Sequence, residues 1–251
     1  MNLEMAFKDY FSSQASGYTR FRPRYPRELF AFVAGTAERR VHAWDCGTGN
    51  GQAAAALAEW FERVTATDAS QSQLSHAEAH PRVTYVLARA EHCPLEPRSV
   101  DLVTVAQALH WFDLPAFYSE VRRVSRPGGV LAAWCYGLAT IETAIDRVVY
   151  HLYEDIVGAY WPPERHVIEL KYATVEFPFV EFAAPEFAIV QDWTCDDLLG
   201  YLNTWSSVEQ YKQQNRVDPV ALIAPELRRA WGSQERRAIH WPIYMRIGHV
   251  E

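Results

Sequence analysis

The stretch that decides the fold is Trp44-Asp45-Cys46-Gly47-Thr48-Gly49-Asn50-Gly51-Gln52. In this stretch a strand-like run ends in an acid, Asp45, and three alternating glycines come after the acid. Glycine has no side chain and adopts positive φ at little cost, so this backbone can turn sharply and approach a ligand closely. Asp45 would repel a phosphate and attract an ammonium or sulfonium charge. We therefore expect a small ligand of that kind on the loop.

Two known motifs contain glycines at similar spacing. A dinucleotide-binding fingerprint places its third glycine where this chain has Gln52, so binding of NAD is disfavoured. The pattern acid-x-Gly-x-Gly-x-Gly is matched in full from Asp45 to Gly51. It is the first motif of the class I S-adenosylmethionine-dependent methyltransferases, and the chain resembles that family, in its methyltransferase-11 branch, over roughly residues 41–134.

Hydrophobic patterns predict alternating strands and helices around this motif. Strands are expected at 41–44, 64–68, 83–87, 100–106 and 130–134, and helices at 52–61 and 115–124. The run 100–106 is almost entirely apolar or β-branched, which is typical of a parallel strand covered on both faces. Beyond residue 135 helices are expected at 141–156, at 194–211 and from 219, with strand candidates at 175–180 and 238–247. Such alternation predicts an α/β protein with a parallel sheet.

The resemblance implies a Rossmann-like, seven-stranded class I methyltransferase fold, with helices on both faces. A helical cap would be inserted in the C-terminal third, between strands five and six. Residues 1–35 would form an N-terminal arm or lid and the first helix, and residues 36–135 the S-adenosylmethionine-binding core. Residues 136–251 would complete the sheet and carry the cap, all within one structural domain.

The family's cofactor contacts fall on particular residues of this chain. The resemblance implies that Asp68, at the end of the second strand, accepts hydrogen bonds from the ribose hydroxyls, and a carboxylate suits two adjacent O–H donors. The segment around Ala90 and Glu91 looks like the family's adenine contact. The full set of expected cofactor-binding residues is Asp45, Gly47, Thr48, Gly49, Gly51, Asp68, Ala90, Glu91, Gln107, Tyr18 and Arg22.

The binding site for the molecule that accepts the methyl group is expected after the fourth predicted strand. The tract Gln107–Asp113 is similar to one in the methyltransferase-11 branch, and ligands of open α/β sheets bind at strand carboxyl ends. His110 is the candidate catalytic group, although a histidine beside aromatic residues is often only packed. The segments 18–26 and 201–206 are similar to the group of trans-aconitate methyltransferase. The expected substrate-pocket residues are Tyr25, His110, Trp111, Tyr136, Trp193 and Trp205.

The amino-acid composition disfavours several classes of protein and of site. A formal charge of −7 disfavours a nucleic-acid surface, and 49% hydrophobic residues argue against disorder. The four cysteines are widely separated, so we expect neither a disulfide framework nor a metal site. No basic leader or apolar run of spanning length is seen, so we expect a cytoplasmic protein without a membrane segment. The oligomeric state is left open.

The function that follows is methyl transfer from S-adenosylmethionine to a small-molecule acceptor, with a carboxylic acid among the candidates. A carboxylate acceptor needs no general base, whereas a phenol, an amine or a carbon acid needs one, supplied by His110 or Tyr136. Two alternatives stay open. One is a methyltransferase-like binding module without turnover, and the other is an NAD-dependent Rossmann oxidoreductase.

Overall fold

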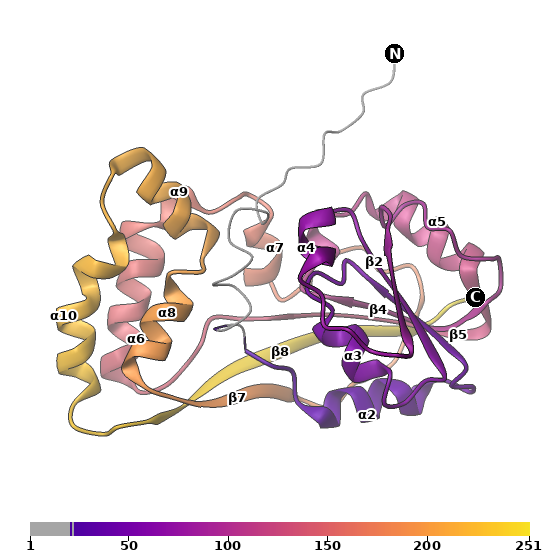
Figure 1. Ribbon diagram of the computed structural model, residues 1–251, viewed down its shortest axis with the longest axis horizontal. Helices are drawn as coiled ribbons and strands as arrows, with labels where there is room; N and C mark the ends of the chain where they lie inside the picture. Colours follow the sequence, from indigo (N-terminus) through magenta and orange to yellow (C-terminus); the bar gives the residue numbers. More distant parts are fainter. Residues whose placement is uncertain (1–20, 22) are drawn as a thin grey trace, which may run out of the picture.

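The computed structural model describes residue 21 and residues 23–251, and the chain there alternates between strands and helices (Figure 1). The strands are β1 (His42–Cys46), β2 (Arg63–Asp68), β3 (Val83–Leu87), β4 (Val100–Ala106), β5 (Ser125–Tyr136), β6 (Val180–Glu181), β7 (Phe187–Trp193) and β8 (Arg237–His249). The longer helices are α2 (Arg27–Thr36), α3 (Gln52–Leu57), α4 (Gln71–Ser75), α5 (Leu114–Val124), α6 (Thr143–Tyr150), α7 (Arg165–Glu169), α8 (Cys195–Leu202), α9 (Ser206–Asn215) and α10 (Pro219–Trp231). Three short helical turns are η2 (Leu109–Trp111), η3 (His151–Ile156) and η4 (Gly158–Tyr160).

One sheet organises the molecule. Its order is β3-β2-β1-β4-β5-β8-β6, and β7 also pairs with β8. Strands β1 to β5 are parallel, and β8 is antiparallel to β5, β6 and β7. The predicted α/β class is confirmed, and the described sheet has eight strands where seven were expected. The edge position beside β8 is shared by two strands, because β8 is long enough to pair with β6 at its end and with β7 at its start.

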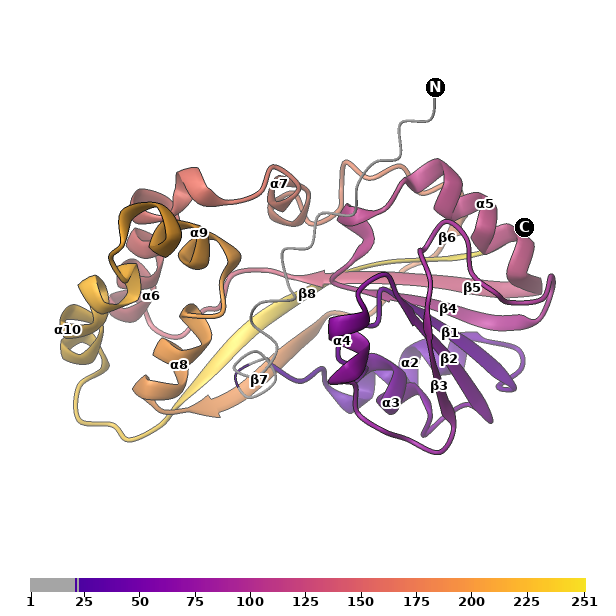
Figure 2. The same ribbon diagram turned by 45° about the horizontal axis from the view of Figure 1, so that its top comes forward.

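The central strands are buried on both faces, as the apolar sequence of β4 predicts. Successive residues of β1 enter different cores: Ala43 packs with the cluster under α2 and α3, and Trp44 packs with the cluster under α5. Figure 2 shows α2 and α3 on one side of the sheet and α5 on the other. The predicted helices on both faces are therefore confirmed, and all five parallel strands end at the same edge of the sheet.

Two predictions in the C-terminal third are wrong. The segment 175–180 forms a strand only from Val180, because Pro178 interrupts it and because Phe177 and Phe179 pack instead on Tyr118 of α5. The edge strand that the pattern missed is β7, ten residues further along. The expected helix over 194–211 is divided into α8 and α9. It breaks where the Thr204 hydroxyl donates to the Tyr201 carbonyl at 2.7 Å, a side-chain bond that competes with the helical ladder.

The helical cap comes from two segments of the chain rather than from one insertion. Helices α6 and α7 lie between β5 and β6, whereas α8, α9 and α10 lie between β7 and β8. Figure 1 shows α6, α8, α9 and α10 gathered in a lobe beside the sheet, with β7 and β8 reaching into it. Helix α8 begins with a capping box, in which Thr194 and Asp197 are bonded reciprocally. Within the described residues, no helix combines the length and the apolar character that crossing a membrane requires.

The first prediction concerns the turn between β1 and α3. Gly51 has φ +80°, and a Cβ there would lie 2.2 Å from the Tyr85 hydroxyl oxygen, so Gly51→Ala forces both a strained backbone and a steric shift. We expect a loss of about 1–3 kcal/mol in the free energy of unfolding. Gly35→Ala is the matched control, since Gly35 lies in α2 with nothing within 4 Å of its added methyl group, and it should be neutral or slightly stabilising. Urea unfolding compares the two, and equal stabilities would contradict the account.

Candidate active site

The glycine loop after β1 is held in a conformation that only glycine adopts readily. Gly47, Gly49 and Gly51 have φ of +68°, +56° and +80°. A Cβ on Gly47 would lie 2.6 Å from that of Ala108, so the loop is pressed against the segment after β4. Among the described residues, a Cβ on Gly49 would meet no atom closer than 3.9 Å. The loop is therefore closely packed at both ends and open in its middle, where a ligand can approach the backbone.

Asp45 is completely buried beneath this loop. Its carboxylate accepts hydrogen bonds from the hydroxyl of Thr48 at 2.5 Å and from that of Thr104, on β4, at 2.7 Å. Burial raises the pKa of Asp45 from 3.8 to about 6, although the bonds from both threonines lower it. The carboxyl group of Asp45 is therefore ionised above about pH 6. Its two hydrogen bonds join the loop to β4 at the centre of the sheet, and the loop lies between its charge and a bound ligand.

Asp68, at the carboxyl end of β2, faces the same loop. Its two oxygens accept the backbone N–H groups of Gly49 and Ser70, each at 2.8 Å. A carboxylate offers about four acceptor positions and can accept several hydrogen bonds at once. Thr48 N also donates to Thr67 O at 3.0 Å, and the ends of β1 and β2 are therefore joined at this edge.

The segments after β3 and β4 close the same edge. Glu91 accepts the backbone N–H of Asp113 at 3.0 Å, while Ala90 beside it is buried. Gln107 has a positive φ of 59°, and its side-chain oxygen accepts the Tyr136 N–H, from β5, at 2.9 Å. The structure thus brings together the predicted residues of the glycine loop, the β2 end, the adenine segment and the β4 end.

His110 lies on η2 in a dry, aromatic environment. Its ring is 4.8 Å from that of Trp111, and its Nδ1 lies 3.2 Å from the hydroxyl oxygen of Tyr172. Burial and the positive charge of Arg165 lower the pKa of His110 to about 3. The imidazole is therefore neutral at physiological pH and is a weak base.

Aromatic residues of the core line the next part of this edge. Tyr25 packs edge-on against Trp134 and Tyr136 of β5, at centroid distances of 5.7 and 6.3 Å. Its hydroxyl is close enough to Tyr172 for its charge to add to the burial that raises the pKa of Tyr172. Trp134 Nε1 is buried and has no hydrogen-bond partner among the described residues. Tyr25, Tyr136, His110 and Tyr172 thus surround the carboxyl ends of β4 and β5.

The other predicted pocket residues lie in the lobe. Trp205 packs against Tyr153 and Trp161, at centroid distances of 5.7 and 5.5 Å. Trp193 packs instead against Tyr201 and Trp241, so the structure does not bring it to the strand ends.

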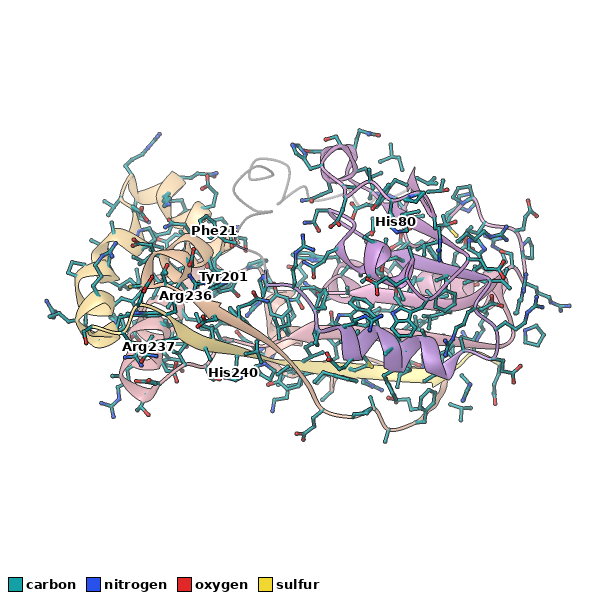
Figure 3. All side chains as sticks on the ribbon, turned by 60° about the horizontal axis from the view of Figure 1, so that its bottom comes forward. Phe21, His80, Tyr201, Arg236, Arg237 and His240 are labelled. Carbon is teal, nitrogen blue, oxygen red and sulfur yellow. The ribbon has the colours of Figure 1, made fainter. Side chains whose placement is uncertain are left out.

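The N-terminal arm is described only in part. Tyr18 and Arg22, the predicted arm contacts, lie outside the described residues. Phe21 lies beside α8 of the lobe (Figure 3), where its ring would be 2.6 Å from a Cβ on Gly200. After it, the Tyr25 N–H donates to Gln52, the first residue of α3, at 3.1 Å. The described part of the arm therefore contacts both the lobe and the core.

Three residues near this edge were not singled out from the sequence: Tyr153, Arg165 and Tyr172. Lys171 and Tyr172 have φ of 57° and 59°, and the resulting turn carries the buried Tyr172 hydroxyl to His110. Arg246, on β8, holds this turn by donating to the carbonyls of Tyr172 and Val175. A turn with two left-handed residues other than glycine has no sequence signature, so no local signal could have identified the position of Tyr172.

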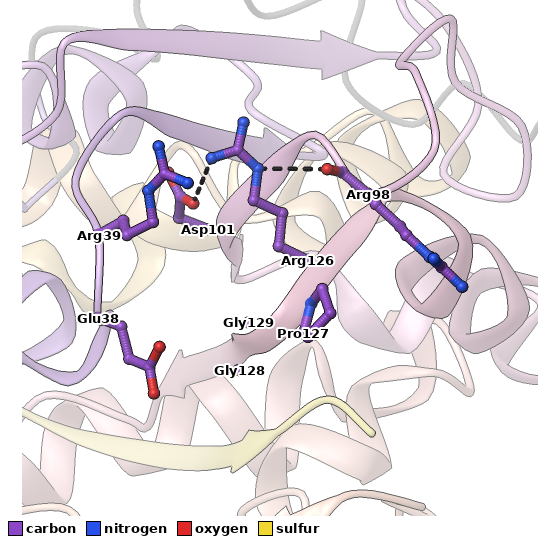
Figure 4. A pocket seen from close by; sticks show the side chains of 8 residues that line it. All are labelled: Glu38, Arg39, Arg98, Asp101, Arg126, Pro127, Gly128 and Gly129. Carbon is purple, nitrogen blue, oxygen red and sulfur yellow. Dashed lines mark hydrogen bonds and ion pairs between the residues drawn. The ribbon is translucent and has the colours of Figure 1, made fainter.

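A separate hollow of about 280 Å³ lies at the opposite edge, near the amino ends of β4 and β5 (Figure 4). Arg126 there donates to Asp101 and to the Arg98 carbonyl, both at 3.2 Å. Asp101 also accepts the backbone N–H groups of Val41 and His42. These charges are paired with one another, and the cluster ties the strand starts together.

The glycine loop and Asp68 fit the predicted cofactor. Gly49 has an open face, its neighbours are packed tightly, and the Asp68 carboxylate lies beside it at the strand ends. Such a cradle of backbone and acceptor atoms suits an adenosyl group with ribose hydroxyl donors.

The second prediction uses the pKa of Asp45. Thr104→Val removes one of its two hydroxyl donors and should destabilise the protein by about 1–3 kcal/mol near pH 8, where the buried carboxylate is charged. The folded pKa of about 6 lies above the unfolded value of 3.8, so Asp45 is protonated in the folded state near pH 5 and the loss should be smaller there. Urea unfolding at both pH values measures this. Thr104→Ser, which keeps the hydroxyl, is the control, and an equal loss at both pH values would be inconsistent with the assignment.

Comparison with known proteins agrees with this geometry. Residues 44–133 match the family described as "Methyltransferase domain". A Dictyostelium discoideum protein whose name places it among the methyltransferases is 35% identical over 253 residues, covering 98% of this chain and 96% of that protein. A Saccharomyces cerevisiae protein named for S-adenosylmethionine-dependent methyl transfer is 29% identical over 177 residues, covering 63% of this chain and 59% of that protein.

A solved structure from Anaeromyxobacter dehalogenans, described as a type II methyltransferase, is 48% identical with a TM-score of 0.86, covering 91% of this chain and 98% of that chain. These relatives do not test the finer resemblance to the group of trans-aconitate methyltransferase, which stays a prediction. The motif, the fold and the full-length similarity agree: the chain belongs to the class I S-adenosylmethionine-dependent methyltransferases, and S-adenosylmethionine is its cofactor.

Proposed function

We propose that the protein methylates the carboxylate of a small-molecule acid. The observation that carries this proposal is the environment of His110, the histidine beside the strand ends. Its pKa of about 3 makes it a poor proton acceptor, whereas phenols, carbon acids and protonated amines must lose a proton to be methylated. A carboxylate is already ionised at neutral pH and needs none.

The proposed reaction moves no proton. One carboxylate oxygen forms the bond to the methyl carbon while the carbon–sulfur electron pair returns to sulfur, which leaves a neutral ester and a neutral thioether. The chain's task is to align the reacting atoms, hold them close and exclude water. In this proposal the open middle of the glycine loop and Asp68 hold the adenosyl group, and the aromatic residues around β4 and β5 enclose the acceptor.

The direct test is product formation. The protein is incubated with S-adenosylmethionine and a panel of aromatic and aliphatic acids, each paired with a phenol or amine of similar shape, and the products are identified by mass spectrometry. Methyl esters and S-adenosylhomocysteine in equal amounts are expected from at least one acid. Methylated phenols or amines without any ester would overturn the proposed acceptor.

The third prediction tests the ribose role proposed for Asp68. Asp68→Ala should weaken binding of S-adenosylhomocysteine by about 1.5–3 kcal/mol, the range for hydrogen bonds to a charged group. Calorimetry measures the affinity, and the melting temperature reports whether the loop contacts to Gly49 and Ser70 survive. Asp196→Ala, at an exposed aspartate of α8, is the matched control and should bind normally. An unchanged affinity in Asp68→Ala would remove the ribose assignment.

The fourth prediction is a flat pH profile. Between about pH 7 and 9 both His110 and a carboxylate acceptor keep their charge states, and Asp45, whose pKa is about 6, stays ionised. The rate constant kcat for ester formation should therefore be nearly independent of pH in this range. His110→Ala should lower it by less than about tenfold, since packing and the contact with the Tyr172 hydroxyl are lost but no base is. A rate that rises with pH in the wild type and falls by roughly 100-fold in the variant would instead identify His110 as a base.

A further inference from the structure

We propose that Arg165 determines the specificity of the acceptor site, by holding one oxygen of the acceptor carboxylate and so selecting the ionised acid over its neutral methyl ester. This inference rests on the proposed function and adds a recognition residue to it. Arg165 is the first residue of α7, and α7 packs against η2, the turn that carries His110. Its charge acts on His110 and on the buried Cys135 of β5, and both residues lie at the strand ends.

The arginine is positioned by aromatic side chains rather than by an ion pair. Its guanidinium carbon lies 4.9 Å from the ring centroid of Trp161 and 5.6 Å from that of Tyr153. Its Nε donates to the Tyr153 hydroxyl at 3.1 Å, and that hydroxyl donates to Glu169 at 2.5 Å. Trp205 packs behind both rings. The stem and Nε are therefore fixed, while the terminal Nη groups make no hydrogen bond and no ion pair with any described residue.

An arginine held in this way is suited to bind an anion. It is half-buried, so an ionic hydrogen bond there is screened less than at the surface. Its planar guanidinium matches the geometry of a carboxylate, and its orientation is set before the ligand arrives. Arg165 and Trp161 also line a cavity of about 360 Å³ on the outer side of α7.

The surrounding charges indicate from which side the anion binds. Glu154 and Glu169 line the same cavity, and their charges would repel an anion there. On its other side α7 packs against η2, and His110 on that turn is neutral at physiological pH, so an anion there meets no repulsion from it. The carboxylate is therefore expected between Arg165 and the strand ends, with one oxygen on the guanidinium and the other directed toward the methyl group.

This arrangement also affects product release. Methylation converts the anion into a neutral ester, which no longer forms a charge-assisted hydrogen bond with Arg165. The acid should therefore bind more tightly than its own product. The same arginine would reject amides and esters of the same shape.

The test uses benzoate and trans-cinnamate as probes, each compared with its methyl ester and its amide. Binding to the full-length protein saturated with S-adenosylhomocysteine is measured by calorimetry near pH 7.5, where both acids are ionised. For at least one acid, the wild type should bind the ionised form on the order of 10- to 100-fold more tightly than the ester or the amide. Arg165→Gln should remove this preference, and Arg165→Lys should retain part of it.

The control is Arg147→Gln, at an exposed arginine of α6, which should keep the full preference. Binding of S-adenosylhomocysteine within about twofold of wild type, together with an unchanged melting temperature, would show that each variant is folded. The inference is overturned if the wild type prefers neither acid over its ester, or if Arg165→Gln keeps the preference.

The two proposals can fail separately. Ester formation with an unchanged acid preference in Arg165→Gln would leave the proposed function intact and exclude the role of Arg165. An acid preference that depends on Arg165, without any ester produced from S-adenosylmethionine, would support the anion site and contradict the proposed reaction.

Discussion

The structure depends on one buried carboxylate. Asp45 cannot leave its place without losing two hydroxyl donors, one on the glycine loop and one on the neighbouring strand β4. A buried charge is tolerated only with such partners, so the loop and the sheet are fixed relative to one another. The three positive-φ glycines then set the path of the backbone, and the strand ends that surround them take their positions from this junction.

The sequence predicted this junction well because its signals are local. An acid, alternating glycines and a two-sided apolar strand each have a direct physical meaning over a few residues, and they located the loop, Asp68 and the β4 end. The boundaries of β4 were predicted to the residue, because both faces of that strand are apolar. Likewise, Thr194 with Asp197 was sufficient to place the start of α8.

The lobe was predicted less well because its structure depends on tertiary contacts. Phe177 and Phe179 have the composition of a strand but pack on Tyr118, and β7 forms because β8 offers a free edge. Tyr172 reaches His110 through a turn with two left-handed residues, which Arg246 holds from β8, and Arg165 precedes this turn on α7. Local sequence propensity depends on none of these contacts. The residues around the expected methyl-acceptor site could therefore be identified only from the structure.

Strand β8 runs unbroken from the lobe, where β7 accompanies it, to its place beside β5 in the sheet. A two-stranded ribbon twists more readily than a wide sheet, but its hydrogen-bonded ladder resists sliding and stretching. The lobe is therefore connected to the core by a torsional element rather than by a slack linker. Its easiest displacement is a rotation about the ribbon axis, which would change the tilt of the cap aromatic residues over the strand ends while the length of the connection stays constant.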